Sequence, residues 1–180
     1  MSRITIPTHE QSPAASKPLL DAVKRQLGVI PNLMKVVGHS PAALEGYLSL
    51  NGALAKGVLD AKLRERLALT VAEFNGCDYC LAAHTYLGKN VARLADAELD
   101  AARQGRSADA KAEAALHFAQ RVTQQRGKVS DADIDTVRRA GFDDAAIMEI
   151  VVNVALNVLT NYVNNVARTD VDFPSVAVAA

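Results

Sequence analysis

Signals for the starts and stops of helices recur along this chain, whereas no stretch of convincing length alternates apolar and polar residues as a strand would. Ser40 followed by Pro41, and the aspartates Asp60 and Asp143, are typical N-terminal residues of helices. We expect helices at about residues 19–27, 41–56, 62–74, 77–87, 108–125, 130–139 and 144–167. This pattern predicts an all-α fold, a single-domain helical bundle.

The length and composition of the chain are those of one folded domain. With 180 residues, 49% of them hydrophobic, the chain is long enough to bury a substantial core. No repeat of fixed period and no second composition regime divides it. We expect an extended N-terminal arm at residues 1–18, a helical domain at 19–170 and a C-terminal tail at 171–180.

The distribution of charge and hydrophobicity argues against nucleic acid and membranes as partners. The 20 basic and 20 acidic side chains cancel, and no basic run is present. The N-terminal residues lack the hydrophobic segment of a signal peptide, and the longest apolar stretch is interrupted by Glu149, Asn153 and Asn157. We therefore expect a cytoplasmic protein, and in that reducing compartment two cysteines seldom form a permanent disulfide.

Both cysteines lie in the stretch Gly76–His84, GCDYCLAAH. A helix from Cys77 to about residue 87, ended by glycine, places Cys77, Cys80 and His84 on one face. The unpaired N–H groups and the positive dipole end of its first turn favour thiolate over thiol. A second thiol can resolve what the first one forms, and His84 is placed to take or hold the proton of Cys80. Tyr79, between the cysteines, adds a possible hydrogen-bond donor.

Two other interpretations of the cysteine pair stay open from the residues alone. A structural zinc site needs four ligands, usually in two pairs, and the sequence has no second pair. The two thiols could also be packed without a chemical role. Idle thiols need no histidine on the same helix face, and a zinc site would lack its second pair of ligands, so we favour a pair of reactive thiols and expect no metal or other cofactor.

A carboxylate upstream of the cysteines is the candidate that orients the histidine. Glu73 lies on a polar stripe together with Lys62, Arg66 and Thr70, which we expect to face water. Glu65 lies off that stripe, between apolar neighbours, where a carboxylate needs a partner or a shifted pKa. Of the two, Glu65 is the better candidate for a partner of His84.

Four asparagines recur on one face of the otherwise apolar last helix: Asn153, Asn157, Asn161 and Asn164. Buried amides need hydrogen-bond partners. We expect these side chains mainly to join helices inside the bundle or across a subunit contact. The alternative is that they line a redox pocket.

The segment Leu63–His84, LRERLALTVAEFNGCDYCLAAH, closely resembles the core motif of the carboxymuconolactone decarboxylase and alkyl hydroperoxidase D-like superfamily. The flanking segments LGVIPNLMKVVGHSPAALEGY and AGFDDAAIMEIVVNVALNVLTNYVNNVARTDVDFP are similar as well, so the resemblance spans about residues 19–174. It is strongest to the branch of peroxidase-related enzymes. It implies an all-α fold of the alkyl hydroperoxidase D-like type.

The resemblance also implies roles for individual residues. Cys80 matches the peroxidatic cysteine and Cys77 the resolving cysteine, so a redox disulfide would join Cys77 and Cys80. His84 matches the histidine that relays the proton, and Glu65 the glutamate at the head of that relay. The best-known alkyl hydroperoxidase members have a histidine at the position of Tyr79, so the relay here is shorter.

These observations together predict a thiol-dependent peroxidase that reduces hydroperoxides through a dithiol/disulfide cycle with a Glu–His proton relay. The family precedent implies a dithiol protein as reductant, lipoyl-bearing or thioredoxin-like, and a homo-oligomer, trimer or hexamer. One alternative is a general disulfide reductase or redox sensor. Another is a lyase that uses His84 and Glu65 as acid and base, although members that decarboxylate the lactone generally lack the cysteine pair. A third is a binding protein without enzymatic activity.

Overall fold

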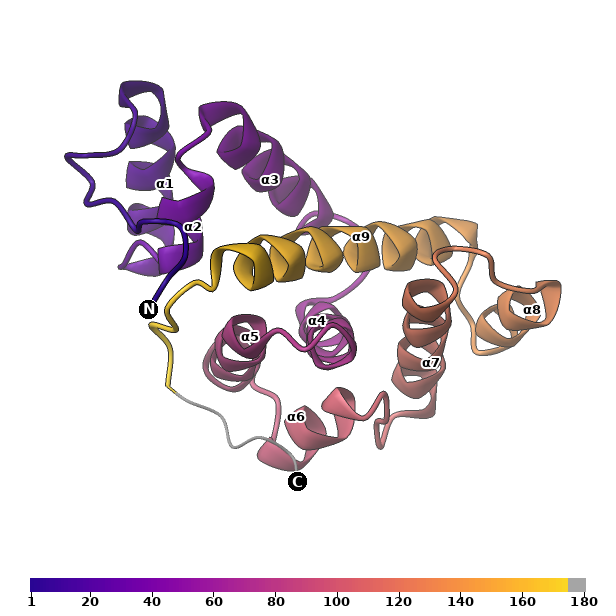
Figure 1. Ribbon diagram of the computed structural model, residues 1–180. Coiled ribbons are helices and arrows are strands. Elements are labelled where there is room, and N and C mark those ends of the chain that lie inside the picture. Colours follow the sequence, from indigo (N-terminus) through magenta and orange to yellow (C-terminus); the bar gives the residue numbers. More distant parts are fainter. Residues whose placement is uncertain (175–180) are drawn as a thin grey trace.

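The computed structural model describes residues 1–174, and every regular element in this part of the chain is a helix (Figure 1). After a 3-10 helix at Ala14–Ser16, the α-helices are α1 (Lys17–Leu27), α2 (Asn32–Val37), α3 (Pro41–Leu54), α4 (Ala61–Phe74), α5 (Asp78–Asn90), α6 (Asp96–Arg103), α7 (Ala110–Gln124), α8 (Asp131–Arg139) and α9 (Asp144–Ala167). The predicted all-α bundle is confirmed.

Several helices begin where the sequence places a capping side chain. The carboxylates of Asp60 and Asp143 each accept a hydrogen bond from the backbone N–H three residues on, at 2.7 and 2.9 Å. Ser130 and Asp133 form a reciprocal capping box at the start of α8. These caps satisfy N–H groups that have no partner inside a helix, and so they fix the first residue of α4, α8 and α9.

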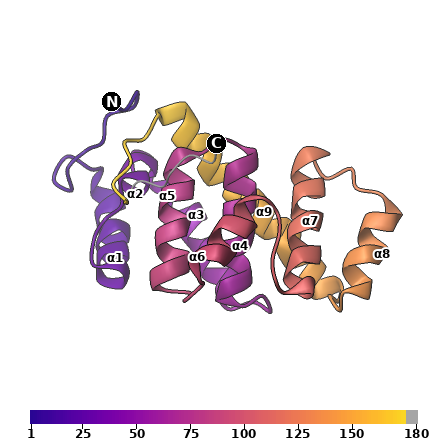
Figure 2. The same ribbon diagram turned by 90° about the horizontal axis from the view of Figure 1, so that it is seen from below.

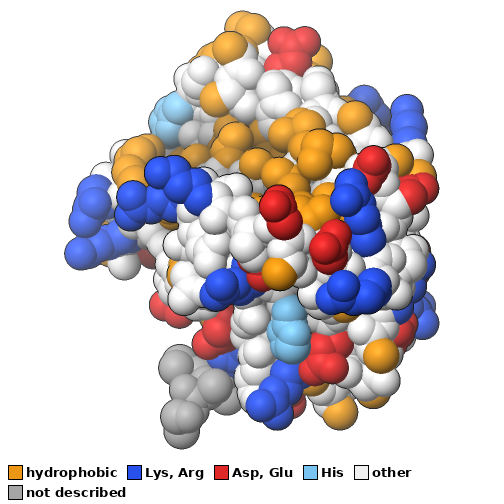
Figure 3. All heavy atoms as spheres, turned by 90° about the vertical axis from the view of Figure 1, so that its right-hand side faces the viewer, with side chains coloured by type: hydrophobic (Ala, Val, Ile, Leu, Met, Phe, Trp, Pro, Cys, Tyr) orange, Lys and Arg blue, Asp and Glu red, His pale blue; other side chains and the backbone are white. Residues whose placement is uncertain are grey.

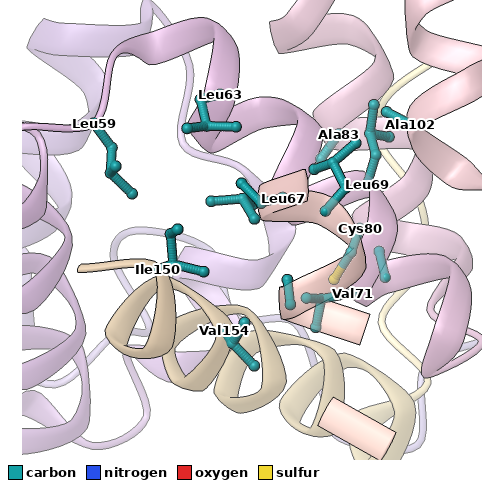
Figure 4. Packing of buried hydrophobic residues seen from close by; sticks show 14 of the residues in the cluster. Leu59, Leu63, Leu67, Leu69, Val71, Cys80, Ala83, Ala102, Ile150 and Val154 are labelled. Carbon is teal, nitrogen blue, oxygen red and sulfur yellow. The ribbon is translucent and has the colours of Figure 1, made fainter. Parts of the chain in front are cut away.

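Helix α4 lies at the centre of the bundle. It contacts α5, α6, α7 and α9, and Figure 1 shows it beneath α9 and between α5 and α7. Its residues Leu67, Leu69 and Val71 have no solvent exposure. Figure 4 shows Leu67 and Val71 in the same packed cluster as Ile150 and Val154 of α9. Packing on several sides therefore holds α4, which carries one half of the candidate site.

Two short helices, α2 and α6, were not expected from the sequence, and α5 does not end at Gly88 as predicted. Helix α5 continues to Asn90. A Cβ atom at Gly88 would lie 2.6 Å from Cδ2 of Leu99 in α6. This glycine therefore allows two helices to approach closely and does not end one.

Of the polar stripe of α4, only Lys62 at its start is exposed to water. Helix α6 covers the rest: Arg66 pairs with Glu98 at 2.9 Å, and Thr70 donates to the carbonyl of Ala102 at 2.6 Å. Glu73 accepts a hydrogen bond from Arg103 at 2.6 Å. The prediction of a solvated stripe was wrong for the part that α6 covers, because α6 was not anticipated, although Glu73 does stay outside the thiol site.

The segment after α9 turns back across the helices near the thiols. Asp172 accepts hydrogen bonds from the backbone of Asn32, at 2.8 Å, and from the hydroxyl of Tyr79, at 2.8 Å. The ring of Phe173 packs edge-on against Tyr79 and also contacts Tyr86. These contacts fix Asp172 and Phe173, which belong to the predicted tail at 171–180, and residues 175–180 of that tail lie outside the described residues.

Helix α9 runs along the length of the molecule, with α1 and α2 near one end and α8 near the other (Figures 1 and 2). By length and composition alone it could cross a membrane, but half of its most apolar 18-residue window is buried inside the protein. Its buried side packs against α2, α3, α4, α5 and α7. Figure 3 shows the side on which α8 lies, where charges of both signs are interspersed around apolar side chains.

Candidate active site

Both thiols lie at the N-terminus of α5, as the sequence indicated. Cys77 is the residue before the helix, and its sulfur accepts a hydrogen bond from the backbone N–H of Cys80 at 3.3 Å. Cys80 is therefore in the first helical turn, where unpaired N–H groups and the helix dipole stabilise negative charge. The two cysteines are free thiols with 0% and 2% of their surface exposed, respectively.

The surroundings of Cys80 favour its thiolate. Its pKa is lowered to about 6, chiefly because the thiol of Cys77 donates a hydrogen bond to its sulfur. Burial opposes this shift, but the positive charge of His84 and the amides of Asn164 and Asn161 add to it. At neutral pH Cys80 is therefore mostly ionised.

Cys77 has the opposite character. Its pKa is raised, because its thiol donates to the Cys80 sulfur, because it is buried and because the Cys80 charge is close. The pair therefore holds a single negative charge, which resides on Cys80. Figure 4 shows the Cys80 sulfur among the core side chains, near Val71.

Glu65 and His84 form the predicted pair. Nδ1 of His84 lies 2.8 Å from Oε2 of Glu65, and both side chains are largely buried, with 23% and 21% of their surface exposed. Burial lowers the pKa of His84, but the charge and hydrogen bond of Glu65 and the charge of Cys80 outweigh it, so the pKa is raised. Glu65 thus favours the protonated form of the imidazole beside the thiolate.

Asparagines of α9 join helices inside the bundle, as mainly expected, and their face also lines the thiol site, which was the alternative. Asn164 donates from Nδ2 to the Cys80 sulfur at 3.3 Å. Asn161 accepts from Asn75 at 2.8 Å, and its own Nδ2 has no partner within hydrogen-bonding geometry among residues 1–174. Asn153 and Asn157 line the pocket in front of Cys80. The period of four residues was visible in the sequence, but the direction of this face depends on how α9 packs on α5.

A pocket of about 220 Å³ opens in front of the site. Cys80, His84 and Glu65 line it, whereas Cys77 does not. Tyr47 of α3 lines it too, a residue to which sequence reasoning gave no role. Burial, together with the charges of Cys80 and Glu65, raises the pKa of Tyr47 to about 12. Its hydroxyl therefore stays protonated and can donate a hydrogen bond to a bound ligand. A single tyrosine in α3 belongs to no sequence motif, so the sequence did not indicate this role.

Tyr79 lines the same pocket, but its hydroxyl is engaged elsewhere. It donates to Asp172 and accepts from the backbone N–H of Leu33 at 3.1 Å. Burial raises its pKa. The role of Tyr79 is thus to fasten α5 to α2 and to the C-terminal segment, and it takes no part in the Glu65–His84 pair.

The remaining features do not compete with this site. A larger cavity of about 370 Å³ lies between the first turns of α4, α7 and α9 and is lined by neither cysteine nor histidine. Within residues 1–174, no group of three or more His, Cys, Asp or Glu side chains is arranged to hold a metal ion.

Residues 41–124 match the model of the carboxymuconolactone decarboxylase family, a segment that contains the Glu65–His84 pair and both cysteines. In this segment the chain is similar to the carboxymuconolactone decarboxylase family. A curated but uncharacterized protein of Haemophilus influenzae is 49% identical over 45 residues, which are 24% of this chain and 40% of the relative. The chain thus matches well under two thirds of that relative's length.

Solved structures share the fold of this chain over almost its whole length. A peroxidase-related protein of Ralstonia eutropha JMP134, described as having the alkylhydroperoxidase AhpD core, has a TM-score of 0.85 at 23% identity and covers 95% of this chain and 92% of its own. A peroxidase-related protein of Silicibacter sp. TM1040 has a TM-score of 0.81 at 22% identity, with 94% and 91% covered. The debrominase Bmp8 has a TM-score of 0.77 at 20% identity, with 94% and 91% covered. Different activities therefore occur on this fold, and the residues of the site must distinguish between them.

Proposed function

We propose that the protein is a thiol-dependent peroxidase that reduces hydroperoxides through Cys80 and Cys77. The observation that carries this proposal is the asymmetry of the two thiols. Cys80 lines the pocket and has a lowered pKa, whereas Cys77 lies behind it, fully buried and protonated. This is the arrangement that a peroxidatic cysteine and its resolving partner require.

In the first step, the Cys80 thiolate attacks the terminal oxygen of R–O–O–H. The O–O bond breaks, the sulfur becomes a sulfenic acid, and the leaving oxygen takes a proton from His84 to give the alcohol. Glu65 keeps His84 protonated and oriented before the step. The tyrosine hydroxyl of Tyr47 is available to donate to the peroxide.

In the second step, Cys77 attacks the sulfenic sulfur, and water leaves as the Cys77–Cys80 disulfide forms. The Cys80 thiolate is one of the groups that raise the pKa of Cys77. Oxidation of Cys80 removes that charge, so Cys77 becomes easier to ionise once its attack is needed. A dithiol protein, lipoyl-bearing or thioredoxin-like, then reduces the disulfide by exchange and returns both thiols.

The test is stopped-flow oxidation of the pre-reduced protein by hydrogen peroxide and by an organic hydroperoxide, with thiols counted before and after. We expect the wild type to lose two thiols per chain. Cys80→Ser should lose all turnover, and Cys77→Ser should consume one equivalent of peroxide and stop at the sulfenic acid. Thiols that persist through many equivalents of peroxide would refute the proposal.

The same variants separate the rival functions. A lyase that uses His84 and Glu65 as acid and base would keep its activity in Cys77→Ser. A disulfide reductase or redox sensor would show the dithiol/disulfide cycle with a negligible rate toward hydroperoxides. A binding protein with inert thiols would be alkylated slowly at both cysteines at neutral pH. We further propose that the protein acts in the cytoplasm as a homo-oligomer, trimer or hexamer, which sedimentation analysis would test.

A further inference from the structure

The pocket in front of Cys80 contains an arginine that the peroxidase mechanism does not use. Arg64 precedes Glu65 on α4, and both line the pocket. Nε of Arg64 is buried and has no hydrogen-bond partner among residues 1–174. Within residues 1–174, its guanidinium makes no hydrogen bond or ion pair with any side chain. A buried donor on a permanent cation requires an explanation, because desolvation without a partner is costly.

The acidic groups around Arg64 do not supply that partner. Glu65, the carboxylate in the pocket lining, is bound to His84 at 2.8 Å. Cys80 carries the other negative charge, but Arg64 is not among the groups that chiefly lower its pKa. The guanidinium is therefore available to a ligand of the pocket.

The rest of the lining suggests the chemical nature of such a ligand. Apolar groups form part of the wall, contributed by Leu33, Ala83 and Leu156. Neutral amides at Gln26 and Asn51 add further hydrogen-bonding groups. One unpaired guanidinium beside an apolar wall matches a compound with a hydrocarbon body and one planar anionic group. Hydrogen peroxide would use neither feature.

We infer that the pocket binds organic hydroperoxides that carry a carboxylate, with Arg64 holding the carboxylate while Cys80 attacks the peroxide. This inference rests on the proposed peroxidase function and names the substrate class of the same site. The carboxylate supplies the ionic partner that Arg64 lacks within residues 1–174, and it keeps the substrate in one orientation in the pocket. Bidentate binding by the planar guanidinium favours a carboxylate over a neutral ester of the same shape.

The test compares three probes: tert-butyl hydroperoxide, its analogue in which one methyl group carries an acetate arm, and the methyl ester of that analogue. The measured quantity is the second-order rate constant of Cys80 oxidation. In the wild type, the acid should react about tenfold or more faster than the ester, the effect of one charge-assisted hydrogen bond. In Arg64→Gln this ratio should fall to near one, and in Arg64→Lys it should be partly retained.

Lys62→Gln is the matched control, because it removes one positive charge from the exposed face of the same helix. It should keep the wild-type ratio. Equal rates for acid and ester in the wild type, or a preference that survives in Arg64→Gln, would overturn the inference.

A binding measurement keeps this inference separate from the peroxidase proposal. The alcohol that corresponds to the acid probe cannot oxidise a thiol, but it should slow the alkylation of Cys80 by iodoacetamide in the wild type and not in Arg64→Gln. Its methyl ester should have no such effect. If no hydroperoxide oxidises the thiols, the peroxidase proposal fails, and protection by the acid still supports the anion site. Absence of protection by the acid would overturn the anion site.

Discussion

Asn164 offers the sharpest test of the electrostatic reasoning, because it is a side chain of another helix that acts on the thiolate. Its Nδ2 donates to the Cys80 sulfur at 3.3 Å, while its Oδ1 has no partner within residues 1–174. Asn164→Ala therefore removes one hydrogen bond to a charged group and leaves no new buried polar atom without a partner. The amide is otherwise surrounded by the core.

The expected magnitude follows from the worth of such a hydrogen bond. A hydrogen bond to a charged group contributes about 1.5–3 kcal/mol, which corresponds to about 1–2 pKa units. The pKa of Cys80, about 6 in the wild type, should rise toward 7–8 by that amount. At pH 7 the thiolate fraction should fall from about nine tenths to between about one half and one tenth.

The assay is the pH dependence of alkylation by iodoacetamide, with the modified cysteine identified by mass spectrometry. A less acidic thiol is also intrinsically more nucleophilic as a thiolate, so the rate at one pH is ambiguous and the midpoint of the profile is diagnostic. Asn165→Ala is the control, since Asn165 is exposed and donates to the backbone of Asn75 instead. A midpoint that stays at the wild-type value in a folded Asn164→Ala protein would refute the reasoning.

Two further predictions concern the proton relay and the helix packing. Glu65→Gln removes the charge that raises the pKa of His84, whereas burial, which lowers this pKa, remains. The imidazole should therefore titrate at lower pH, as measured by NMR of its C–H protons. An unchanged midpoint would contradict the assignment. Gly88→Ala should lower the free energy of unfolding by about 1–3 kcal/mol in urea, because the new methyl group meets the buried Leu99. Gly52 is an exposed helical glycine with open space where a Cβ atom would lie, so Gly52→Ala should raise the free energy of unfolding by about 0.5–1 kcal/mol. A change of the same sign in the free energy of unfolding for both variants would disprove the packing argument.

The helices that the sequence predicted are those with local start signals. Caps such as Asp60, Ser130 and Asp143 act within a single turn, so they can be recognised from a few adjacent residues of the sequence. Helices α2 and α6 were missed because they are short, and neither has a side-chain cap hydrogen bond at its start. The predicted end of α5 at Gly88 was also wrong, because only the packing of α6 on α5 shows that this glycine allows the two helices to make contact.

The core of the candidate site was also accessible from sequence. Cys77, Cys80 and His84 share one face of one helix, and that geometry follows from helical spacing alone. Glu65 could be chosen over Glu73 because an apolar environment makes a carboxylate dependent on a partner, and Glu65 indeed lies 2.8 Å from His84. In both cases the prediction needs only the positions of residues on a single helix, whose period is known.

What only the tertiary structure decided is how separate helices meet around the sulfur. The sequence shows that Asn164 recurs on a helix face, but not that this face meets Cys80. Tyr47 and Arg64 carry no local signal, and they became parts of the pocket only when α3 and α4 packed beside α5. The sequence by itself determined the reactive face of α5, because backbone geometry repeats with a fixed period. The pocket, the stabilisation of the thiolate and the unpaired arginine depend on contacts between distant residues, which no local period encodes.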